Sequence, residues 1–313
     1  MLSRKVFSLF AIGYLLLAIN CSPPPVENIY RKHGIFPGGI NVPVAFLVNE
    51  WAGKAKVMGS AWLIDGGNGV LFSAKHVVDA FLNDRIELGG SECKIFLYGR
   101  VYDCVVARVP PLRDAVVLKL TSPFNSSELP KPYKIATEKV KIGDKLFIQG
   151  LHPHPKEIRD ANEREGFKDT VMPIFRTFYE LRAGNECVDT EIVFDSLEAK
   201  VVELGLHIKI DDQGDSPMDK LKYDANSYFR VETSRNHKFS FGGLSGGVAV
   251  RLNKDGEPEA VGIVTAERPV ILDYDENGDL VSPCGMPPMV SNTMMITPIE
   301  SVADETEYAR RMR

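Results

Sequence analysis

Short apolar runs separated by turn residues constrain the fold of this chain more than any other feature. Each run is rich in Val, Ile, Phe and Leu and is bounded by Gly, Pro or Asp. The runs cover 42–48, 57–64, 70–73, 94–98, 103–108 and 115–120, and later 140–150, 199–210, 228–233, 247–252 and 260–265. Because such runs are typical of strands and no long 3.6-residue periodicity interrupts them, we predict an all-β sandwich or barrel.

A stretch rich in Pro, Asn, Ser and Lys at 123–132 divides these runs into two sets. We therefore expect one domain over 42–305, with a first barrel at 42–122 and a second at 133–300. The charged stretch at about 151–185 has no clean strand pattern, and we expect an inserted loop that could include a helical turn.

The end of the chain, from 298 to 313, carries acidic residues early and arginines late. This charge order suits a helix macrodipole, so we expect a C-terminal helix that occupies 306–313 at its end.

The first residues resemble an export signal. Arg4 and Lys5 precede an apolar run at 6–19, which is too short to span a bilayer comfortably but suits a signal-peptide core. Cys21 and a proline-rich tether follow, as in bacterial lipoproteins, although Ala18 and Asn20 depart from the usual signal. We expect a signal at 1–21, a tether at 22–41, and export to the bacterial cell envelope as a lipoprotein anchored to the membrane through Cys21, facing the periplasm or the exterior. An uncleaved helix and a soluble secreted product are the alternatives.

The net charge of -5 and the pI near 5.8 give no general attraction to a phosphate backbone, so we expect no nucleic-acid partner. Apart from Cys21, the chain has Cys93, Cys104, Cys187 and Cys284, an even number that permits disulfides in an oxidising compartment. Cys93 and Cys104 flank a segment that could fold as a hairpin and join its ends, or they could be buried free thiols.

The sequence Gly-Leu-Ser-Gly-Gly at 243–247 is the most informative motif. A nucleophilic serine needs a tight turn that exposes its hydroxyl, and glycine permits one. Ser245 is the candidate nucleophile, and the N–H groups of Gly243 and Ser245 could form an oxyanion hole. The alternative is a glycine-rich hairpin turn.

Two further residues could complete a catalytic triad. His76 follows an apolar strand, and an imidazole there could take the serine proton at neutral pH. Asp114 stands at the mouth of an apolar strand, where a buried carboxylate needs a partner such as an imidazole N–H. Asp114 could instead be a turn residue or an ion-pair partner of Arg113.

These three segments, in the order His, Asp, Ser, resemble the chymotrypsin-fold serine peptidases, particularly the bacterial heat-shock type without its PDZ domain. Segments 59–64, 142–150, 261–265 and 292–298 are similar to strands of that family. The resemblance implies two packed antiparallel six-stranded β-barrels with a C-terminal helix. It implies an endopeptidase that acts on proteins or peptides through an acyl-enzyme, without a cofactor.

The resemblance also implies that Thr265 supports the aspartate and that Thr265, Ala266 and Glu267 pair with an extended substrate. Phe239, Ser240 and Phe241 could line the primary pocket, although the approach to Ser245 is too long to align securely with relatives. Leu244 stands where digestive enzymes carry an aspartate that pairs with a new N-terminus.

Other functions stay open. A non-catalytic binding module of the envelope could keep this fold, and an esterase is a further alternative that would place its serine in a parallel sheet. No metal is expected, because the histidines and cysteines lack close ligand spacing. The acidic stretches at 211–215 and 273–279 suggest calcium only weakly, since neither completes an EF-hand loop.

Overall fold

The structure is a computed structural model that describes residues 42–51, 54–79, 92–97, 100–110, 112–172, 180–181, 190–207, 216–237, 240–271 and 290–311. The predicted signal and tether, with Cys21, lie outside the described residues. So do Cys187, Cys284 and the acidic stretches at 211–215 and 273–279.

The first half of the chain forms a closed antiparallel barrel. Its strands are β1 (Val44–Trp51), β2 (Lys54–Asp65), β3 (Val70–Ser73), β4 (Glu92–Leu97), β5 (Arg100–Arg108) and β6 (Val116–Leu120). They pair in the order β1-β4-β5-β6-β3-β2, and β1 also pairs with β2, which closes the ring. Short β10 (Glu180–Leu181) adds to β2 in parallel.

The second half forms another closed barrel. Its strands are β8 (Lys145–His154), β11 (Glu191–Leu206), β12 (Tyr228–His237), β13 (Val248–Leu252), β14 (Pro258–Ile271) and β15 (Val290–Pro298). They pair antiparallel in the order β12-β15-β14-β13-β8-β11, and pairing of β11 with β12 closes the ring. Short strands β7 (Lys134–Ile135) and β9 (Thr170–Val171) flank β14 and β11.

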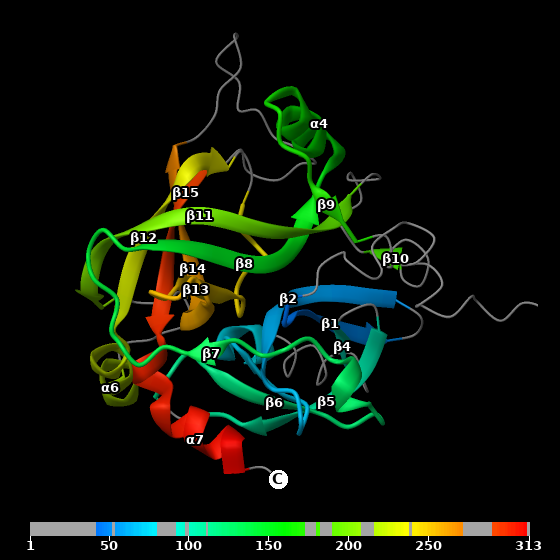
Figure 1. Ribbon diagram of the computed structural model, residues 1–313, viewed down its shortest axis with the longest axis vertical. Helices are drawn as coiled ribbons and strands as arrows, with labels where there is room; N and C mark the ends of the chain where they lie inside the picture. Colours follow the sequence, from blue (N-terminus) through cyan, green and yellow to red (C-terminus); the bar gives the residue numbers. More distant parts are fainter. Residues whose placement is uncertain are drawn as a thin grey trace, which may run out of the picture.

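The two barrels pack against each other through β8 of the second and β1 and β2 of the first. Figure 1 shows the first barrel, in blue and cyan, below the second. Alternating apolar residues fill each interior: Phe46, Trp62 and Phe72 are fully buried in the first barrel, and Ile148 and Val231 in the second. The predicted pair of six-stranded barrels is confirmed.

Helices occupy the connections and the end of the chain. They are η1 (Ser126–Glu128), α4 (Lys156–Arg164), α6 (Pro217–Ala225), η3 (Ile299–Val302) and α7 (Ala303–Arg311). The predicted C-terminal helix is confirmed: η3 contacts β14 and β15, and α7 contacts β2 and β6, so this end of the chain joins both barrels (Figure 1). Within the described ranges no helix has the length and apolar character needed to cross a bilayer.

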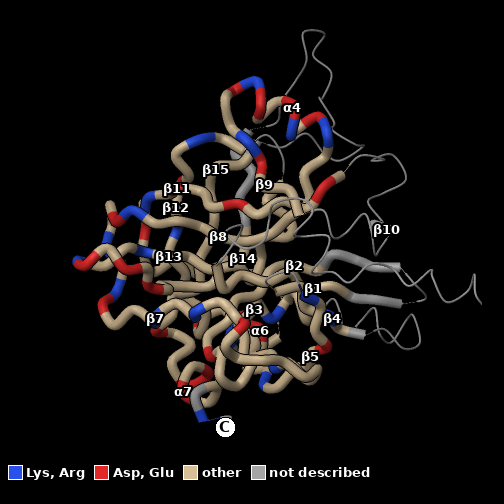
Figure 2. The backbone as a smooth tube through the Cα atoms, turned by 45° about the vertical axis from the view of Figure 1, so that its right-hand side comes forward, with Lys and Arg blue, Asp and Glu red and all other residues tan. Residues whose placement is uncertain are grey.

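Several elements differ from the sequence prediction, and one open alternative, the state of Cys93 and Cys104, is settled. β8 extends to His154, and α4 lies in the stretch predicted as an insertion. α6, which begins with a capping box between Ser216 and Asp219, was not predicted. Cys93 and Cys104 form a disulfide across the hairpin of β4 and β5, with their Cα atoms 5.6 Å apart. Figure 2 shows acidic and basic residues interspersed over the outer loops and helices, as on α4.

Candidate active site

His76 and Asp114 form a hydrogen-bonded pair on the first barrel. His76 lies on the helical turn at 75–79 that follows β3, and Asp114 lies in the bend before β6. Nδ1 of His76 is 2.9 Å from Oδ2 and 3.2 Å from Oδ1 of Asp114, and the backbone N–H of His76 donates to Oδ1 at 3.0 Å. Because a carboxylate only accepts, Nδ1 carries the ring proton of a neutral His76, and Nε2 is the ring nitrogen with the basic lone pair.

Two neighbouring strands place this pair where His76 is partly exposed to solvent and Asp114 is buried. Since β3 and β6 are neighbours, with Ser73 opposite Val116, the residues that follow one and precede the other meet at the same edge. The side chain of His76 is 32% exposed, whereas that of Asp114 is 7% exposed. Burial acts to raise the pKa of Asp114, but the charge of His76 and its hydrogen bonds outweigh burial and hold the pKa below its ordinary value. Asp114 is therefore an ionised carboxylate at neutral pH.

A residue that the sequence did not single out holds the bend of Asp114. Asn226, at the end of α6, accepts a hydrogen bond from the backbone N–H of Asp114 at 3.2 Å and donates to the carbonyl of Leu112 at 2.8 Å. Arg113 does not pair with Asp114, because its Nε donates to the carbonyl of Ser301. The signal for Asn226 was weak, since an Asn after a helix is usually read only as a cap.

Ser245 lies on a tight turn of the second barrel, between β12 and β13. Gly246 has a φ of +85°, and a Cβ added there would lie 2.1 Å from the carbonyl oxygen of Ser60 and 3.1 Å from the backbone nitrogen of Ala74. Only glycine permits so close an approach. The turn therefore contacts the segment just before His76, which brings Ser245 to the face that carries the His76–Asp114 pair.

Ser60 of β2 connects the two barrels beneath this turn. Its backbone N–H donates to the carbonyl of Ser245 at 2.8 Å. Its hydroxyl donates to the carbonyl of Gly243 at 2.9 Å and accepts from the N–H of Leu151 at 2.8 Å. Ser60 is fully buried, so these contacts fix the turn of one barrel against a strand of the other.

The two amides proposed for the oxyanion hole lie in this turn. Gly243 has a φ of +98°, a conformation that glycine tolerates. Within the described part of the chain, neither the N–H of Gly243 nor that of Ser245 has a hydrogen-bond acceptor.

Ser245 also lies beside β14. Its hydroxyl donates to the carbonyl of Thr265 at 3.3 Å. The pairing of β13 with β14 reaches Val248 and Ile263, and β14 then continues past the Ser245 turn through Thr265, Ala266 and Glu267. The predicted substrate strand thus runs along the candidate nucleophile.

The resemblance implies that the hydroxyl of Thr265 supports Asp114, but the hydroxyl bonds elsewhere. It lies 2.6 Å from the hydroxyl of Thr297 and 3.3 Å from the carbonyl of Ile263, because Thr265 faces the neighbouring strand β15. Asp114 is instead oriented by His76 and by Asn226.

The predicted pocket residues are described only in part. Ser240 accepts from the N–H of Gly242 at 2.9 Å, and Phe241 is buried with its ring 4.8 Å from that of His237. Phe239 and the side chain of Glu267 lie outside the described residues.

No protein-family model matches the chain, and no curated protein matches it. Among solved structures, it is similar to the Rv3671c protease from M. tuberculosis in its active form, with 14% identity, a TM-score of 0.46, and 91% of this chain and 86% of that chain covered. It is also similar to the HtrA-type protease AlgW with a decapeptide, with 14% identity, a TM-score of 0.46, and coverage of 85% and 64%. The contacts within this chain, and not these similarities, establish the closed barrels and the His76–Asp114 pair.

Proposed function

We propose that the protein is a serine endopeptidase with His76, Asp114 and Ser245 as its triad. The observation that carries this proposal is the hydrogen bond of Nδ1 of His76 to a buried, ionised Asp114, beside a glycine turn that presents Ser245. This arrangement leaves Nε2 of His76 as the base and orients its ring.

In the proposed reaction, the hydroxyl of Ser245 turns from the carbonyl of Thr265 toward Nε2 of His76. His76 takes its proton while Oγ attacks the scissile carbonyl carbon, and the oxyanion accepts hydrogen bonds from the N–H groups of Gly243 and Ser245. His76 then gives the proton to the leaving amine as the C–N bond breaks. A water molecule, deprotonated by His76, hydrolyses the acyl-enzyme and restores the hydroxyl of Ser245.

The proposed substrate is an extended stretch of protein or peptide. The backbone of β14 at Thr265, Ala266 and Glu267 would add the substrate as a further strand, so that main-chain hydrogen bonds supply affinity. Side pockets near Ser240 and Phe241 would supply specificity.

The test is covalent labelling of the purified full chain with a fluorophosphonate probe. We expect mass spectrometry to find the probe on Ser245. Ser245→Ala should abolish labelling, and His76→Ala should slow it by about 10²–10⁴-fold, the usual contribution of a general base. Ser127→Ala and His207→Gln, both at exposed residues outside the triad, are the matched controls and should label as the wild type does.

The competing function is a binding module that keeps the fold without catalysis. A folded wild-type chain that neither labels at Ser245 nor cleaves any peptide of a substrate library would favour that module. Labelling at a serine other than 245 would also reject the proposed triad.

We further propose that the chain is exported and carries lipid on Cys21, on the strength of Arg4, Lys5 and the apolar run at 6–19. Expression in a bacterial host should place the wild type in the membrane fraction and Cys21→Ala in the soluble envelope fraction. Recovery of both proteins in the same fraction would reject the anchor.

A further inference from the structure

Four polar side chains lie inside one end of the second barrel, where strand alternation calls for apolar residues. The inward row of β8 begins with the buried Leu146 and Ile148 and ends with His152 and His154. On the neighbouring strand β11, Asp195 belongs to the same inward row as Leu197. His237, at the end of β12, completes the group, and all four residues are buried. Burying such groups is costly unless partners satisfy them.

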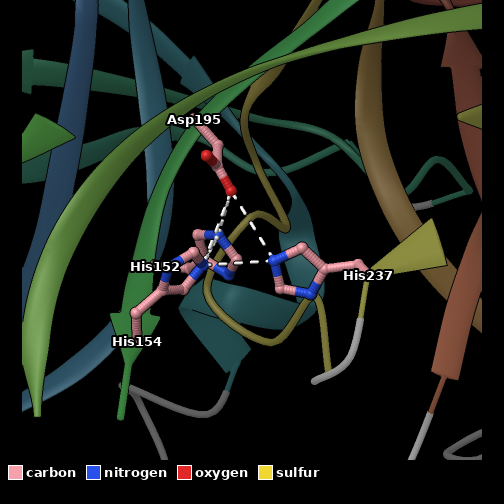
Figure 3. A group of neighbouring side chains, drawn as sticks. All are labelled: His152, His154, Asp195 and His237. Carbon is pink, nitrogen blue, oxygen red and sulfur yellow. Dashed lines mark hydrogen bonds and ion pairs between the residues drawn. The ribbon is translucent and has the colours of Figure 1, made fainter. Parts of the chain in front are cut away.

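The side chains point at one another through one atom each, as Figure 3 shows. Nε2 of His152 lies 2.6 Å from Oδ2 of Asp195, and Nε2 of His154 lies 2.9 Å from Nε2 of His152 and 3.1 Å from Nε2 of His237. Nε2 of His154 and of His237 lie 3.5 and 3.8 Å from the same oxygen of Asp195. These four atoms all fall within 4.8 Å of one another.

Hydrogen bonds among the four do not account for this convergence. Nδ1 of His154 lies 2.6 Å from a carboxylate oxygen of Asp169 and therefore carries the ring proton of a neutral His154. The lone pair on Nε2 of His154 then faces two other Nε2 atoms and a carboxylate. Each Nε2 can hold at most one proton, so the five contacts cannot all be hydrogen bonds. A cation at their centre would satisfy every lone pair at once.

We propose that His152, His154, His237 and Asp195 bind one Zn²⁺ ion in a closed tetrahedral site. Metal–ligand bonds of about 2.0–2.1 Å place tetrahedral ligand atoms about 3.3 Å apart. Five of the six separations run from 2.6 to 3.8 Å and bracket that value, and the sixth, between His152 and His237, is no more than 4.8 Å. Binding would lengthen the His152–Asp195 contact and draw His237 inward. Imidazole nitrogen with a carboxylate oxygen suits zinc, and four buried protein ligands leave no open position for substrate, so the site is structural.

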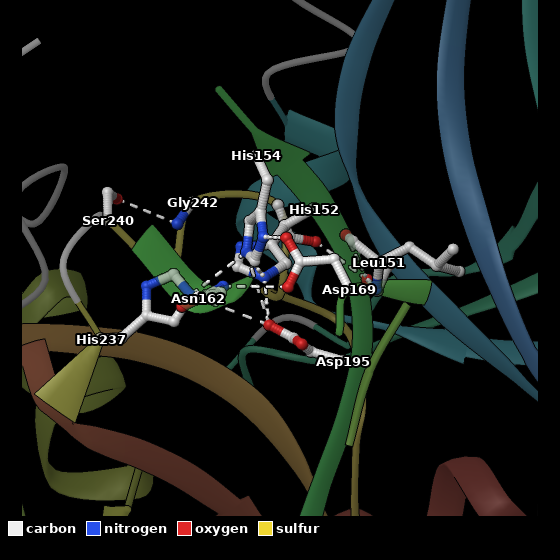
Figure 4. A network of polar contacts seen from close by, with 11 residues as sticks. Leu151, His152, His154, Asn162, Asp169, Asp195, His237, Ser240 and Gly242 are labelled. Carbon is white, nitrogen blue, oxygen red and sulfur yellow. Dashed lines mark hydrogen bonds and ion pairs between the residues drawn. The ribbon is translucent and has the colours of Figure 1, made fainter. Parts of the chain in front are cut away.

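The surroundings of His154 support this assignment (Figure 4). The bond from Nδ1 of His154 to Asp169 is the carboxylate–histidine contact that orients metal ligands in proteins. Nδ2 of Asn162, on α4, donates to the other oxygen of Asp169 at 2.9 Å. Both residues belong to the inserted segment, which therefore contributes a second layer of contacts around the ion.

The site lies against the turn that carries the proposed oxyanion hole. A Cβ added to Gly243 would lie 2.9 Å from Cβ of His152, and the ring of His237 packs against that of Phe241, tilted by 35°, with 4.8 Å between their centroids. Zinc would thus fix both ends of the segment from His237 to Gly243. This consequence rests on the proposed function, whereas the metal site itself does not.

The first measurement is the zinc content of the full chain, purified through a tag that contains no histidine and desalted after incubation with excess zinc. We expect about one zinc per chain in the wild type, as in a closed structural site, and less than a tenth of that in His154→Gln and Asp195→Asn. His207→Gln is the matched control, because His207 is exposed and lies outside the cluster. Equal zinc in the wild type and in both ligand variants, or none in the wild type, would overturn the proposal.

A second measurement does not depend on the folding of any variant. Wild-type protein freed of metal by a chelator is titrated with Co²⁺, and the visible spectrum should show the intense bands of tetrahedral Co²⁺, displaced by one equivalent of Zn²⁺. The weak spectrum of octahedral Co²⁺ would overturn the proposed geometry.

The effect on the turn is measured separately as the rate of fluorophosphonate labelling at Ser245. Chelation should slow labelling of the wild type and of His207→Gln, and restored zinc should recover it. Bound zinc without any labelling would support the metal site while rejecting the peptidase. Labelling of Ser245 without bound zinc would support the peptidase while rejecting the metal site.

Discussion

At the scale of single residues, buried polar groups position the candidate catalytic side chains. Asp114 is almost inaccessible, yet its carboxylate stays ionised because the ring and the backbone N–H of His76 donate to it. Ser60 is completely buried and makes hydrogen bonds to Ser73 in its own barrel and to Gly243 and Leu151 in the second. Substitution of each such residue has a predictable effect, because removal of its side chain leaves its buried hydrogen-bond partners unsatisfied.

The first prediction concerns Asp114→Asn, which keeps the shape of the side chain but removes its charge. We expect kcat to fall by about 10⁴-fold through loss of the correct His76 tautomer. The folded pKa of Asp114 lies below its unfolded value of about 3.9, so its contribution to stability is present above that value and is lost as pH falls through the folded pKa. Urea unfolding should therefore show a gap between wild type and variant at about pH 6 that narrows below about pH 4. A gap that widens on acidification would contradict this account.

The second prediction concerns Ser60→Ala, which leaves the buried N–H of Leu151 and the carbonyl of Gly243 without their hydroxyl partner. The free energy of unfolding should fall by about 1–3 kcal/mol, the cost of unsatisfied buried groups. Because the same contacts hold the Ser245 turn, kcat should fall as well. Ser127→Ala on the exposed helix η1 is the control for removal of a hydroxyl, and an equally small effect of both changes would disprove the role of Ser60.

At the scale of elements, a covalent bond constrains the hairpin of β4 and β5. The Cys93–Cys104 disulfide closes a loop with a sequence separation of 11 at one edge of the first barrel. The strand ladder already brings these cysteines opposite each other, so the bond adds mainly by restricting the unfolded chain.

The third prediction is that Cys93→Ser combined with Cys104→Ser lowers the free energy of unfolding by about 2–3 kcal/mol, as expected for a loop of this size. Dithiothreitol should lower the Tm of the wild type to about that of the double variant and should change the Tm of the double variant less. A wild-type Tm that does not respond to the reductant would show that the two thiols are not bonded in solution.

At the scale of the whole molecule, the candidate triad is divided between the barrels. His76 and Asp114 come from the first barrel, and Ser245 comes from the second. The contact between barrels therefore sets the distance between base and nucleophile, while η3 and α7 contact both bodies at the end of the chain. A small change at this contact should affect catalysis more than folding.

The fourth prediction tests this contact with Gly59→Ala. The new Cβ would lie 2.7 Å from the carbonyl oxygen of Ser245 and 2.9 Å from the side chain of Val77, which follows His76. The two halves of the triad should move apart, and kcat/KM should fall by about 10²-fold, as for a misplacement of about 1 Å.

The matched control is Gly66→Ala, where the nearest atom to the new Cβ is 3.5 Å away, an ordinary contact. Its kcat/KM and Tm should equal those of the wild type. Gly59→Ala with unchanged kcat/KM would show that the contact does not position the triad.

The sequence by itself predicted the strands, the terminal helix and the three candidate catalytic residues, from apolar runs, from charge order and from motifs in the order His, Asp, Ser. Alternating apolar runs indicate strands, and Gly243 to Gly247 indicate a tight turn at Ser245. Only the tertiary structure decided which distant groups meet. Asn226 holds the bend of Asp114 across more than a hundred residues, and Thr265 turns to Thr297 instead.

The histidine cluster shows the same division most clearly. His152 and His154 stand two residues apart on a strand and so share one face, which is a local signal for paired ligands. Asp195 lies 43 residues after His152, and His237 lies 83 residues after His154. Both reach the pair only when β11 and β12 close the barrel. Ligand spacing in the sequence therefore indicates only this pair and not the whole site, because barrel closure, and not proximity in the chain, brings the four ligand atoms together.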